Sequence, residues 1–262
     1  MKIWHNTRLV DEVSLPAVGA SWLVGDGAFE SIRTYSGQIF ELERHLQRLE
    51  SALSNLLIEG PTVAQLIVGA QSVVAANPAS VAGVEFGRLR ITVFSDGQWL
   101  ATHVPYQVED KALSLTRYPE TRFSRNALSK IKSTSYAENF RASRLAKANG
   151  FDDALFVNEA NQVVETTVAN ILWMKDGVWH TSKLNSGCLP GLTRALLVEE
   201  FGVQESELQE SEIGKCEALA ITSSLREVVP VERYESNFYP SSKLVSPLQT
   251  SFHGWILDKL RS

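Results

Sequence analysis

The chain has 262 residues, of which 44% are apolar and 21% are charged, and its net charge is −5 at pH 7. This apolar content allows one large core or two smaller ones, and the acidic balance argues against a nucleic-acid partner, which needs clustered lysine and arginine. No apolar run approaches the roughly 20 residues of a membrane span, and the opening "MKIWHNTRLVDEV" lacks the apolar stretch of a signal peptide. We therefore expect a cytoplasmic protein with no membrane partner.

The first third of the chain alternates strand-like and helix-like runs. Residues 27–35, "GAFESIRTY", have the apolar and β-branched content of a strand, and residues 36–38 are typical of a turn. Within residues 39–56 leucines recur at intervals of three and four, which predicts a helix with one apolar face. A second helix is predicted at about 62–76, and residues 86–97 indicate a strand closed by an Asp-Gly turn.

The middle of the chain differs in composition from the first third. Residues 105–126 are polar and irregular and contain two prolines, which is typical of a connection between domains. We therefore predict an N-terminal α/β domain at 1–104, an interdomain linker at 105–126 and a C-terminal domain at 127–262. The elements do not follow a strict βαβ alternation, so the fold class is α+β.

The second half begins with a helix and continues mainly with strands. Ser135 and Glu138 have the spacing of a capping box at the start of a helix over 136–148, which "NG" ends. The runs "DALFVN", "QVVET", "ANILWM" and "VWHT" are strand-like. A helix is predicted to begin near Leu192 after a Pro-Gly loop, and residues 218–234 indicate a strand, a hydroxyl-rich turn and a second strand.

Two lysines lie two positions apart in "LSKIKSTSYAEN", Lys130 and Lys132, among small hydroxyl side chains. By composition alone, solvent-exposed lysines are the better interpretation, because most lysines lie at the surface. An amine held in a poorly hydrated pocket, however, loses its proton more readily, since desolvation penalises the ammonium form. Such a neutral amine can form a Schiff base with a carbonyl compound or with pyridoxal phosphate.

Four further features are weak when taken singly. Glu165 is typical of an exposed turn, but beside a pyridine nitrogen its carboxylate would favour the protonated ring. Arg48 is either a solvent-facing helix residue or a guanidinium fork for a phosphate. The helix start near Leu192 offers backbone N–H groups to an anion, as any helix after a loop does. The hydroxyls at 222–224 most often bond their own backbone.

Five blocks of the sequence, taken in their order, resemble the fold-type IV pyridoxal-phosphate enzymes. They are "GDGAFESIRTYSGQIFELERHLQRLESA", "IKSTSYAEN", "VVETTVANILWMKDGVWHT", "GCLPGLTRALL" and "ITSSLREVVPV", and they span nearly the whole chain. That family includes branched-chain aminotransferases, D-amino acid aminotransferases and 4-amino-4-deoxychorismate lyases. The resemblance implies a two-domain fold with a smaller N-terminal and a larger C-terminal domain, pyridoxal 5′-phosphate as cofactor, and a homodimer.

The resemblance also implies roles for particular residues. Lys132 is the catalytic residue that forms the Schiff base, and Lys130 is only its neighbour. The residues implied to bind the cofactor are Arg48, Tyr136, Glu165, Leu192, Thr193, Ser223 and Ser224. Glu165 would bind the pyridine nitrogen, Tyr136 the phenolic oxygen, and the others the phosphate. Phe29 and Arg90 would contact the substrate. None of the five histidines has metal-ligand spacing with another, and Cys188 and Cys216 lie far apart, so no metal site or disulfide framework is expected.

Three functions follow from these residues, in decreasing order of preference. The first is an aminotransferase that moves an amino group between an amino acid and a 2-oxo acid through Lys132. The second is a 4-amino-4-deoxychorismate lyase, which releases pyruvate and 4-aminobenzoate with the same cofactor. The third is a non-enzymatic dimeric scaffold, which has no need for Lys132, Glu165 and Arg48 together.

The strand at 86–97 favours the aminotransferase over the lyase. Its end reads "FSDG", where the D-amino acid and lyase members carry an arginine and a glycine. Arg90 instead lies nearer the strand arginine of the branched-chain enzymes. The length of the chain favours the lyase group, and the identity and chirality of the amino acid stay open.

Overall fold

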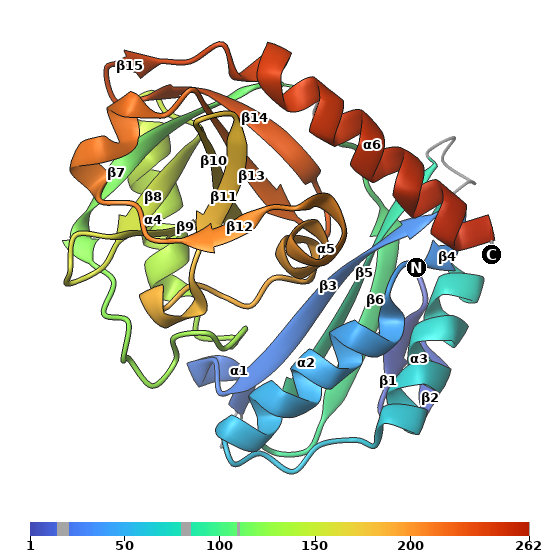
Figure 1. The fold of residues 1–262 in the computed structure, drawn as a ribbon. Helices are drawn as coiled ribbons and strands as arrows, with labels where there is room; N and C mark the ends of the chain where they lie inside the picture. Colours follow the sequence, from blue (N-terminus) through green and yellow to red (C-terminus); the bar gives the residue numbers. More distant parts are fainter. Residues whose placement is uncertain (15–20, 80–84, 109–110, 262) are drawn as a thin grey trace. The chain divides into compact units, whose positions relative to one another are not determined.

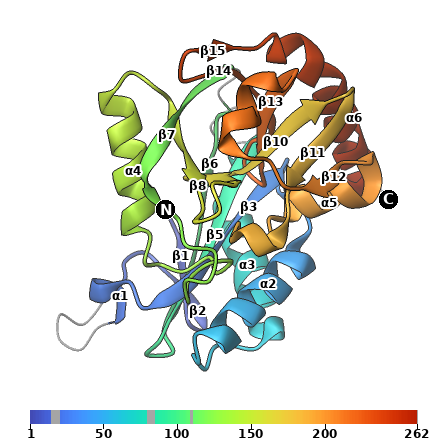
Figure 2. The ribbon, with the colours of Figure 1, turned by 60° about the vertical axis from the view of Figure 1, so that its left-hand side comes forward.

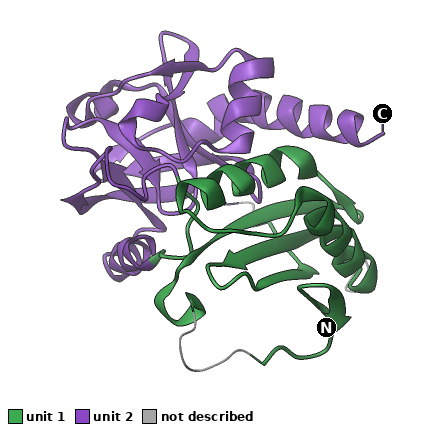
Figure 3. Ribbon diagram, turned by 90° about the horizontal axis from the view of Figure 1, so that it is seen from below, with its two compact units in different colours: residues 1–108, 131–136 green, residues 109–130, 137–262 purple. Residues whose placement is uncertain are grey.

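The computed structural model describes residues 1–14, 21–79, 85–108 and 111–261. The chain forms two compact units, drawn in different colours in Figure 3. Unit 1 consists of Met1–Val108 and Ile131–Tyr136, and unit 2 consists of Glu109–Lys130 and Ala137–Ser262. The short segment Ile131–Tyr136, which the sequence places with the C-terminal domain, thus belongs to unit 1.

Unit 1 is built on a six-stranded sheet with the strand order β2-β1-β6-β5-β3-β4. All its strand pairs are antiparallel. The strands are β1 (Ile3–His5), β2 (Arg8–Val10), β3 (Gly27–Tyr35), β4 (Gln38–Ile39), β5 (Phe86–Phe94) and β6 (Trp99–Pro105). A short helix, α1 (Ser21–Val24), precedes β3, while α2 (Leu42–Asn55) and α3 (Val63–Ala76) lie along the sheet in Figure 1.

The core of unit 1 confirms the leucine pattern of the sequence. Leu46, Leu49 and Leu53 of α2 are buried in one apolar cluster with Ile32 of β3 and Leu89 of β5. The other two leucines of the pattern are partly buried against the same cluster. The apolar face of α2 is therefore the face that packs on the sheet.

Unit 2 contains a nine-stranded sheet with the path β12-β11-β10-β13-β14-β7-β8-β9, and β15 pairs with β14. The strands are β7 (Leu113–Thr121), β8 (Asp153–Val157), β9 (Val163–Thr166), β10 (Asn170–Lys175), β11 (Val178–Ser182), β12 (Gln204–Ser206), β13 (Ala218–Ser223), β14 (Glu227–Tyr234) and β15 (Asn237–Phe238). A further pairing of β9 with β10 closes six of these strands into a ring. Every strand of the ring contributes at least one residue to a single buried cluster, which includes Leu115, Leu155, Val163, Ile171, Ile221 and Val231.

Three helices cover the strands of unit 2. Helix α4 (Ala137–Ala148) packs on β7 and β8, α5 (Leu192–Phe201) packs on β13, and α6 (Ser241–Arg261) packs on β13 and β14. Figure 2 shows α4 beside β7 and α6 beside the strands of the ring. Within the described residues, no helix combines the length and the apolar character that crossing a membrane requires.

Two local features differ from the sequence predictions. The range 105–126, predicted to be a linker, contains β7, which pairs in parallel with β14 and β8. The predicted capping box at Ser135 is wrong, because α4 begins at Ala137 and the Ser135 hydroxyl donates to the Gly25 carbonyl at 2.7 Å. The Glu138 carboxylate instead lies 3.2 Å from Nε of Arg122.

Two helical glycines make a matched test of the packing. A Cβ at Gly69 of α3 would lie 2.3 Å from the Trp99 ring and 2.7 Å from Nε1 of Trp4, whereas one at Gly254 of α6 would meet no atom within 4 Å. We expect Gly69→Ala to lower the free energy of unfolding by about 1–3 kcal/mol through overpacking. Gly254→Ala should raise it by up to about 1 kcal/mol, because alanine favours helix. Urea unfolding measures both, and equal effects would contradict the packing of α3.

Candidate active site

Lys132 is fixed by backbone pairing with the start of β3. Ser133 forms an antiparallel bridge with Ala28, the Phe29 N–H donates to the Lys132 carbonyl at 2.9 Å, and the Thr134 N–H donates to the Gly27 carbonyl at 2.8 Å. Lys132 is half-buried, whereas Lys130 is exposed and has a φ of 69°. The two lysines of the sequence motif thus have different surroundings.

The side chain of Lys132 lies against two aromatic rings. Its Nζ is 4.5 Å from the ring centroid of Phe29 and 5.4 Å from that of Tyr136, and these rings meet edge to face at 5.3 Å. The Phe29 ring also contacts a second cationic side chain, Arg90, whose Cζ is 3.8 Å from the ring centroid. Unit 1 therefore brings together four of the residues that the sequence singled out.

Arg48 lies in the same unit and is held by a carboxylate that sequence reasoning missed. Its Nε donates to Oε1 of Glu30 at 2.8 Å, and its Nη2 donates to Oε2 at 2.7 Å. Glu30 has no exposed surface, and Nδ1 of His45 lies 2.7 Å from its Oε2. Burial opposes ionisation of Glu30, but Arg48 and then His45 lower the pKa of this carboxyl far below its usual range.

The surroundings of His45 favour its neutral form. Burial lowers its pKa, and the charges of Arg48 and Lys132 lower it further, against the opposite effect of Glu30. Since Nδ1 faces a carboxylate, the proton of the neutral ring lies on Nδ1 and is donated to Glu30. His45 thus stabilises the carboxylate that holds Arg48.

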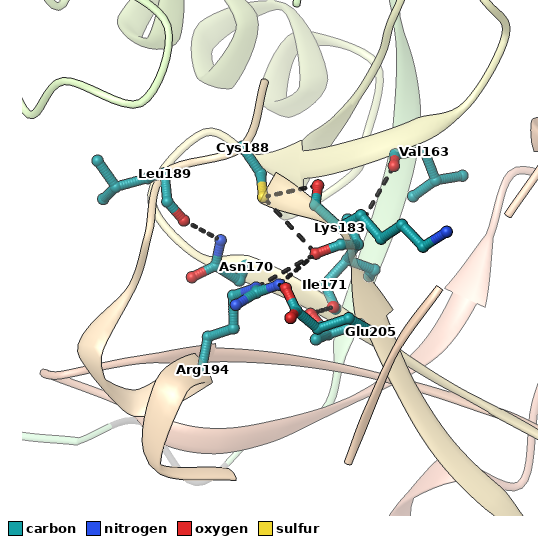
Figure 4. Close-up of polar contacts among 10 residues, drawn as sticks. Val163, Asn170, Ile171, Lys183, Cys188, Leu189, Arg194 and Glu205 are labelled. Carbon is teal, nitrogen blue, oxygen red and sulfur yellow. Dashed lines mark hydrogen bonds and ion pairs between the residues drawn. The ribbon is translucent and has the colours of Figure 1, made fainter. Parts of the chain in front are cut away.

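In unit 2, Glu165 and Asn170 are cross-strand partners of β9 and β10. Both are buried, and both bind Leu189. The Leu189 N–H donates to Oε2 of Glu165 at 2.9 Å, and Nδ2 of Asn170 donates to the Leu189 carbonyl at 2.9 Å, the contact drawn in Figure 4. Oε1 of Glu165 lies 3.7 Å from Nη1 of Arg122, a residue that sequence reasoning also missed.

Helix α5 begins two residues after Pro190 with an N-cap, Gly191, that provides no side-chain hydrogen bond. Leu192 and Thr193 are buried at this start, where the first N–H groups of a helix lack intrahelical partners and attract anions. The buried Arg194 anchors the first turn, because its Nε and Nη2 donate to the Ser182 carbonyl at 3.2 and 2.6 Å. The same guanidinium also donates to the Glu205 carboxylate, and both residues are labelled in Figure 4.

The hydroxyl residues of the 222–224 segment lie where β13 ends. Ser223 is the last residue of the strand, Ser224 follows in the turn, and both are half-buried. Thr222 is fully buried, and its Oγ1 has no hydrogen-bond partner. In the part of the chain that the structure describes, no group of three or more His, Cys, Asp or Glu side chains is placed to hold a metal ion.

The sequence and the fold are similar to those of known enzymes. A model of the amino-transferase class IV family matches residues 27–234. The putative branched-chain-amino-acid aminotransferase of Methanocaldococcus jannaschii is 28% identical over 88% of this chain and 87% of its own length. The aminodeoxychorismate lyase of Bacillus subtilis is 28% identical over 91% of this chain and 88% of its own length.

A solved structure confirms the predicted α+β fold of fold-type IV. The fold IV transaminase of Curtobacterium pusillum has a TM-score of 0.87 and 21% identity, covering 98% of this chain and 98% of that chain. At this level of identity the likeness establishes the arrangement of the elements and not the substrate.

The Glu30–His45 pair predicts a pH dependence of stability. The pKa of His45 is lower in the folded chain than in the unfolded chain, so the unfolded chain binds more protons as the pH falls. The free energy of unfolding should therefore decrease from pH 7 to about pH 5.5, by up to about 1.4 kcal/mol per pH unit from this group. In His45→Asn, whose amide can still donate to Glu30, this decrease should be smaller. Urea unfolding at several pH values tests this, and an unchanged slope would contradict it.

Proposed function

The chain belongs to the class IV aminotransferase family, and we propose that it transfers an amino group between an amino acid and a 2-oxo acid. Enzymes of this family depend on pyridoxal phosphate. The proposal is carried by the setting of Lys132, whose Nζ lies against Phe29 and Tyr136 while Lys130 is exposed. An amine in such a setting suits reaction with an aldehyde better than a hydrated surface amine does.

The donor groups of the chain fit this cofactor. Its aldehyde needs an amine, which Lys132 provides, and its ring nitrogen needs an acid, for which we propose the buried carboxylate of Glu165. Its phosphate needs N–H and O–H donors. The start of α5 at Leu192 and Thr193, which has no side-chain cap, would provide the N–H donors. Ser223 and Ser224 would provide the O–H donors.

Arg48 suits the phosphate as a fixed charge. Two of its nitrogens donate to Glu30, so its guanidinium is oriented before any ligand binds. A pre-oriented fork loses less conformational entropy on binding an anion than a mobile side chain does. Tyr136, beside Lys132, is the proposed donor to the phenolic oxygen.

The chain's own groups then have distinct roles in the transfer. When bound, the cofactor supplies an electron sink for the substrate's Cα. We propose that Nζ of Lys132 takes the proton from Cα and returns it during transfer, as a general base and acid. Glu165 would keep the ring nitrogen protonated, and Arg90 would receive the substrate carboxylate beside Phe29.

A lyase acting on 4-amino-4-deoxychorismate is the second candidate, favoured by the similarity to the Bacillus subtilis enzyme over most of both chains. Holoenzyme mixed with single L- or D-amino acids separates the two. Conversion to the pyridoxamine form supports transfer, whereas no conversion together with release of 4-aminobenzoate from aminodeoxychorismate supports the lyase. The homodimer and the cytoplasmic location remain predictions from the sequence. If the purified chain binds no cofactor, only the third hypothesis, a non-enzymatic dimeric scaffold, would remain.

Lys132 provides the direct test of the proposal. After borohydride reduction of the holoprotein, peptide mass spectrometry should find the pyridoxyl group on Lys132. Lys132→Ala should lose activity by at least about 10²–10⁴-fold, the contribution typical of a positioned base. Lys130→Ala, at the exposed neighbouring lysine, should retain activity. An adduct on Lys130, or reversed effects of the two substitutions, would refute the assignment.

Arg90 has a natural control on its own strand. Arg88 lies on the same face of β5, two residues away, but is exposed. If Arg90 binds the substrate carboxylate, Arg90→Ala should raise KM about 10- to 100-fold, since a charge-assisted hydrogen bond contributes about 1.5–3 kcal/mol. Arg88→Ala should leave KM nearly unchanged. Steady-state kinetics with amino acid and 2-oxo acid decide this, and equal effects would remove Arg90 from the site.

A further inference from the structure

We propose that Asn170 is a positioning residue of the cofactor site, which holds the Leu189 peptide against Glu165 and thereby fixes the loop that leads into α5. This inference rests on the proposed function. Asn170 would act on two groups at once, the acid proposed to bind the ring nitrogen and the N–H groups proposed to bind the phosphate. The Asn170 side chain itself would contact neither the ring nitrogen nor the phosphate.

The Leu189 peptide groups are held from both sides. The Leu189 N–H donates to Oε2 of Glu165 at 2.9 Å, and the Leu189 carbonyl accepts from Nδ2 of Asn170 at 2.9 Å. The same carbonyl also accepts the Gly191 N–H at 2.8 Å, which closes a tight turn around Pro190. Leu189 is therefore the point at which the acid, the asparagine and the approach to α5 are linked.

The other anchors of this loop and of the first turn of α5 act at other points. Nδ2 of Asn158 donates to the Ser186 carbonyl at 3.3 Å, and Cys188 and Arg194 both contact the Ser182 carbonyl. Figure 4 shows the contacts of Cys188 and Arg194 apart from the contact between Asn170 and Leu189. Asn170 thus holds the stretch that immediately precedes the N–H groups of Leu192 and Thr193.

Gly191 shows how closely Asn170 approaches the loop. A Cβ at Gly191 would lie 2.0 Å from Oδ1 of Asn170. The φ of Gly191 is −65°, which any residue adopts, so the contact and not the backbone conformation excludes a side chain here. A methyl group at 191 would displace the Asn170 amide, and removing that amide would make room for the methyl group.

Two changes should follow from the loss of this amide. The Leu189 carbonyl would lose one of its donors, so the turn into α5 would hold its N–H groups less firmly. The Leu189 N–H would also hold Glu165 less firmly, which would change how strongly the acid favours the protonated ring. A purely structural asparagine would lower stability without either effect on the cofactor.

A double-mutant cycle on the full chain tests the contact. We expect Asn170→Ala to weaken binding of pyridoxal phosphate about tenfold, as loss of one oriented hydrogen bond does. Gly191→Ala should weaken it at least as much, and the same change in the Asn170→Ala background should cost much less. Asn77→Ala is the control, because Nδ2 of Asn77 also donates to backbone carbonyls, of Lys2 and Val73, in unit 1.

Two readouts on the same variants are independent of turnover. Amide hydrogen exchange of the cofactor-free chain should become faster in residues 187–193 for Asn170→Ala and not for Asn77→Ala. The pH at which the visible band of the bound cofactor changes should shift in Asn170→Ala alone. Three outcomes would overturn the role of Asn170. They are additive effects of the substitutions at 170 and 191 on cofactor affinity, unchanged amide exchange in residues 187–193, and a cofactor affinity of Asn170→Ala equal to that of Asn77→Ala. Absence of a wild-type adduct on Lys132 would instead overturn the proposed function.

Discussion

One strand pairing, Asn170 opposite Glu165, closes the ring of strands in unit 2 and also sets the polar groups beside it. The two residues flank a tight turn in which the Thr166 N–H donates to the Ala169 carbonyl at 2.8 Å. Residues five positions apart across a two-residue turn are cross-strand partners, so their side chains lie on the same face. The E-x-x-x-x-N spacing in the sequence is thus the spacing of a hairpin, and both side chains can reach Leu189.

The turn itself is held from two other elements. Nδ2 of Asn139 in α4 donates to the Thr167 carbonyl at 2.7 Å, and the Thr167 hydroxyl donates to Oδ1 of Asp153 in β8 at 2.5 Å. Burial raises the pKa of Asp153, although the hydrogen bond from the Thr167 hydroxyl opposes the shift. Unit 1 uses a comparable arrangement around a buried charge, since Glu30 is matched by Arg48 and His45. A buried ion pair is costly to break once formed, which keeps Arg48 in one orientation.

The sequence predicted the elements whose signal is local. Strand β3 has the predicted bounds, and α2 follows from the spacing of its leucines. Strand β7 was missed because the two prolines of residues 105–126 are typical of a linker. The one within β7, Pro119, is exposed and lies where the pairing with β8 changes register, a place that tolerates proline. No prediction covered α6, although its buried Val245, Leu248, Phe252 and Ile256 have helical spacing, because Pro247 interrupts the pattern.

The candidate site shows the same division between local and long-range information. The residues that we propose to contact a ligand, such as Lys132 and Glu165, lie in motifs that can be recognised in the sequence. The groups that act through another side chain, Glu30, Arg122 and Arg194, reach their partners only after folding. The position of Lys132 depends on the pairing of Ile131–Tyr136 with β3, which lies about 100 residues earlier in the chain. Local sequence patterns do not predict such a long-range pairing.

The register of β3 and β5 bears on the choice of substrate. Ser31 pairs with Arg90 and Phe29 pairs with Thr92, so Arg90 lies on the face of the sheet that carries Phe29. The residues that follow β5 form its turn into β6, where the Ser95 N–H donates to the Asp26 carbonyl and Gly97 has a φ of 80°. This turn carries no guanidinium, so the arginine of β5 that we propose to bind the substrate carboxylate is Arg90, which lies against Phe29. That placement is compatible with the amino-acid substrate of the proposed transfer.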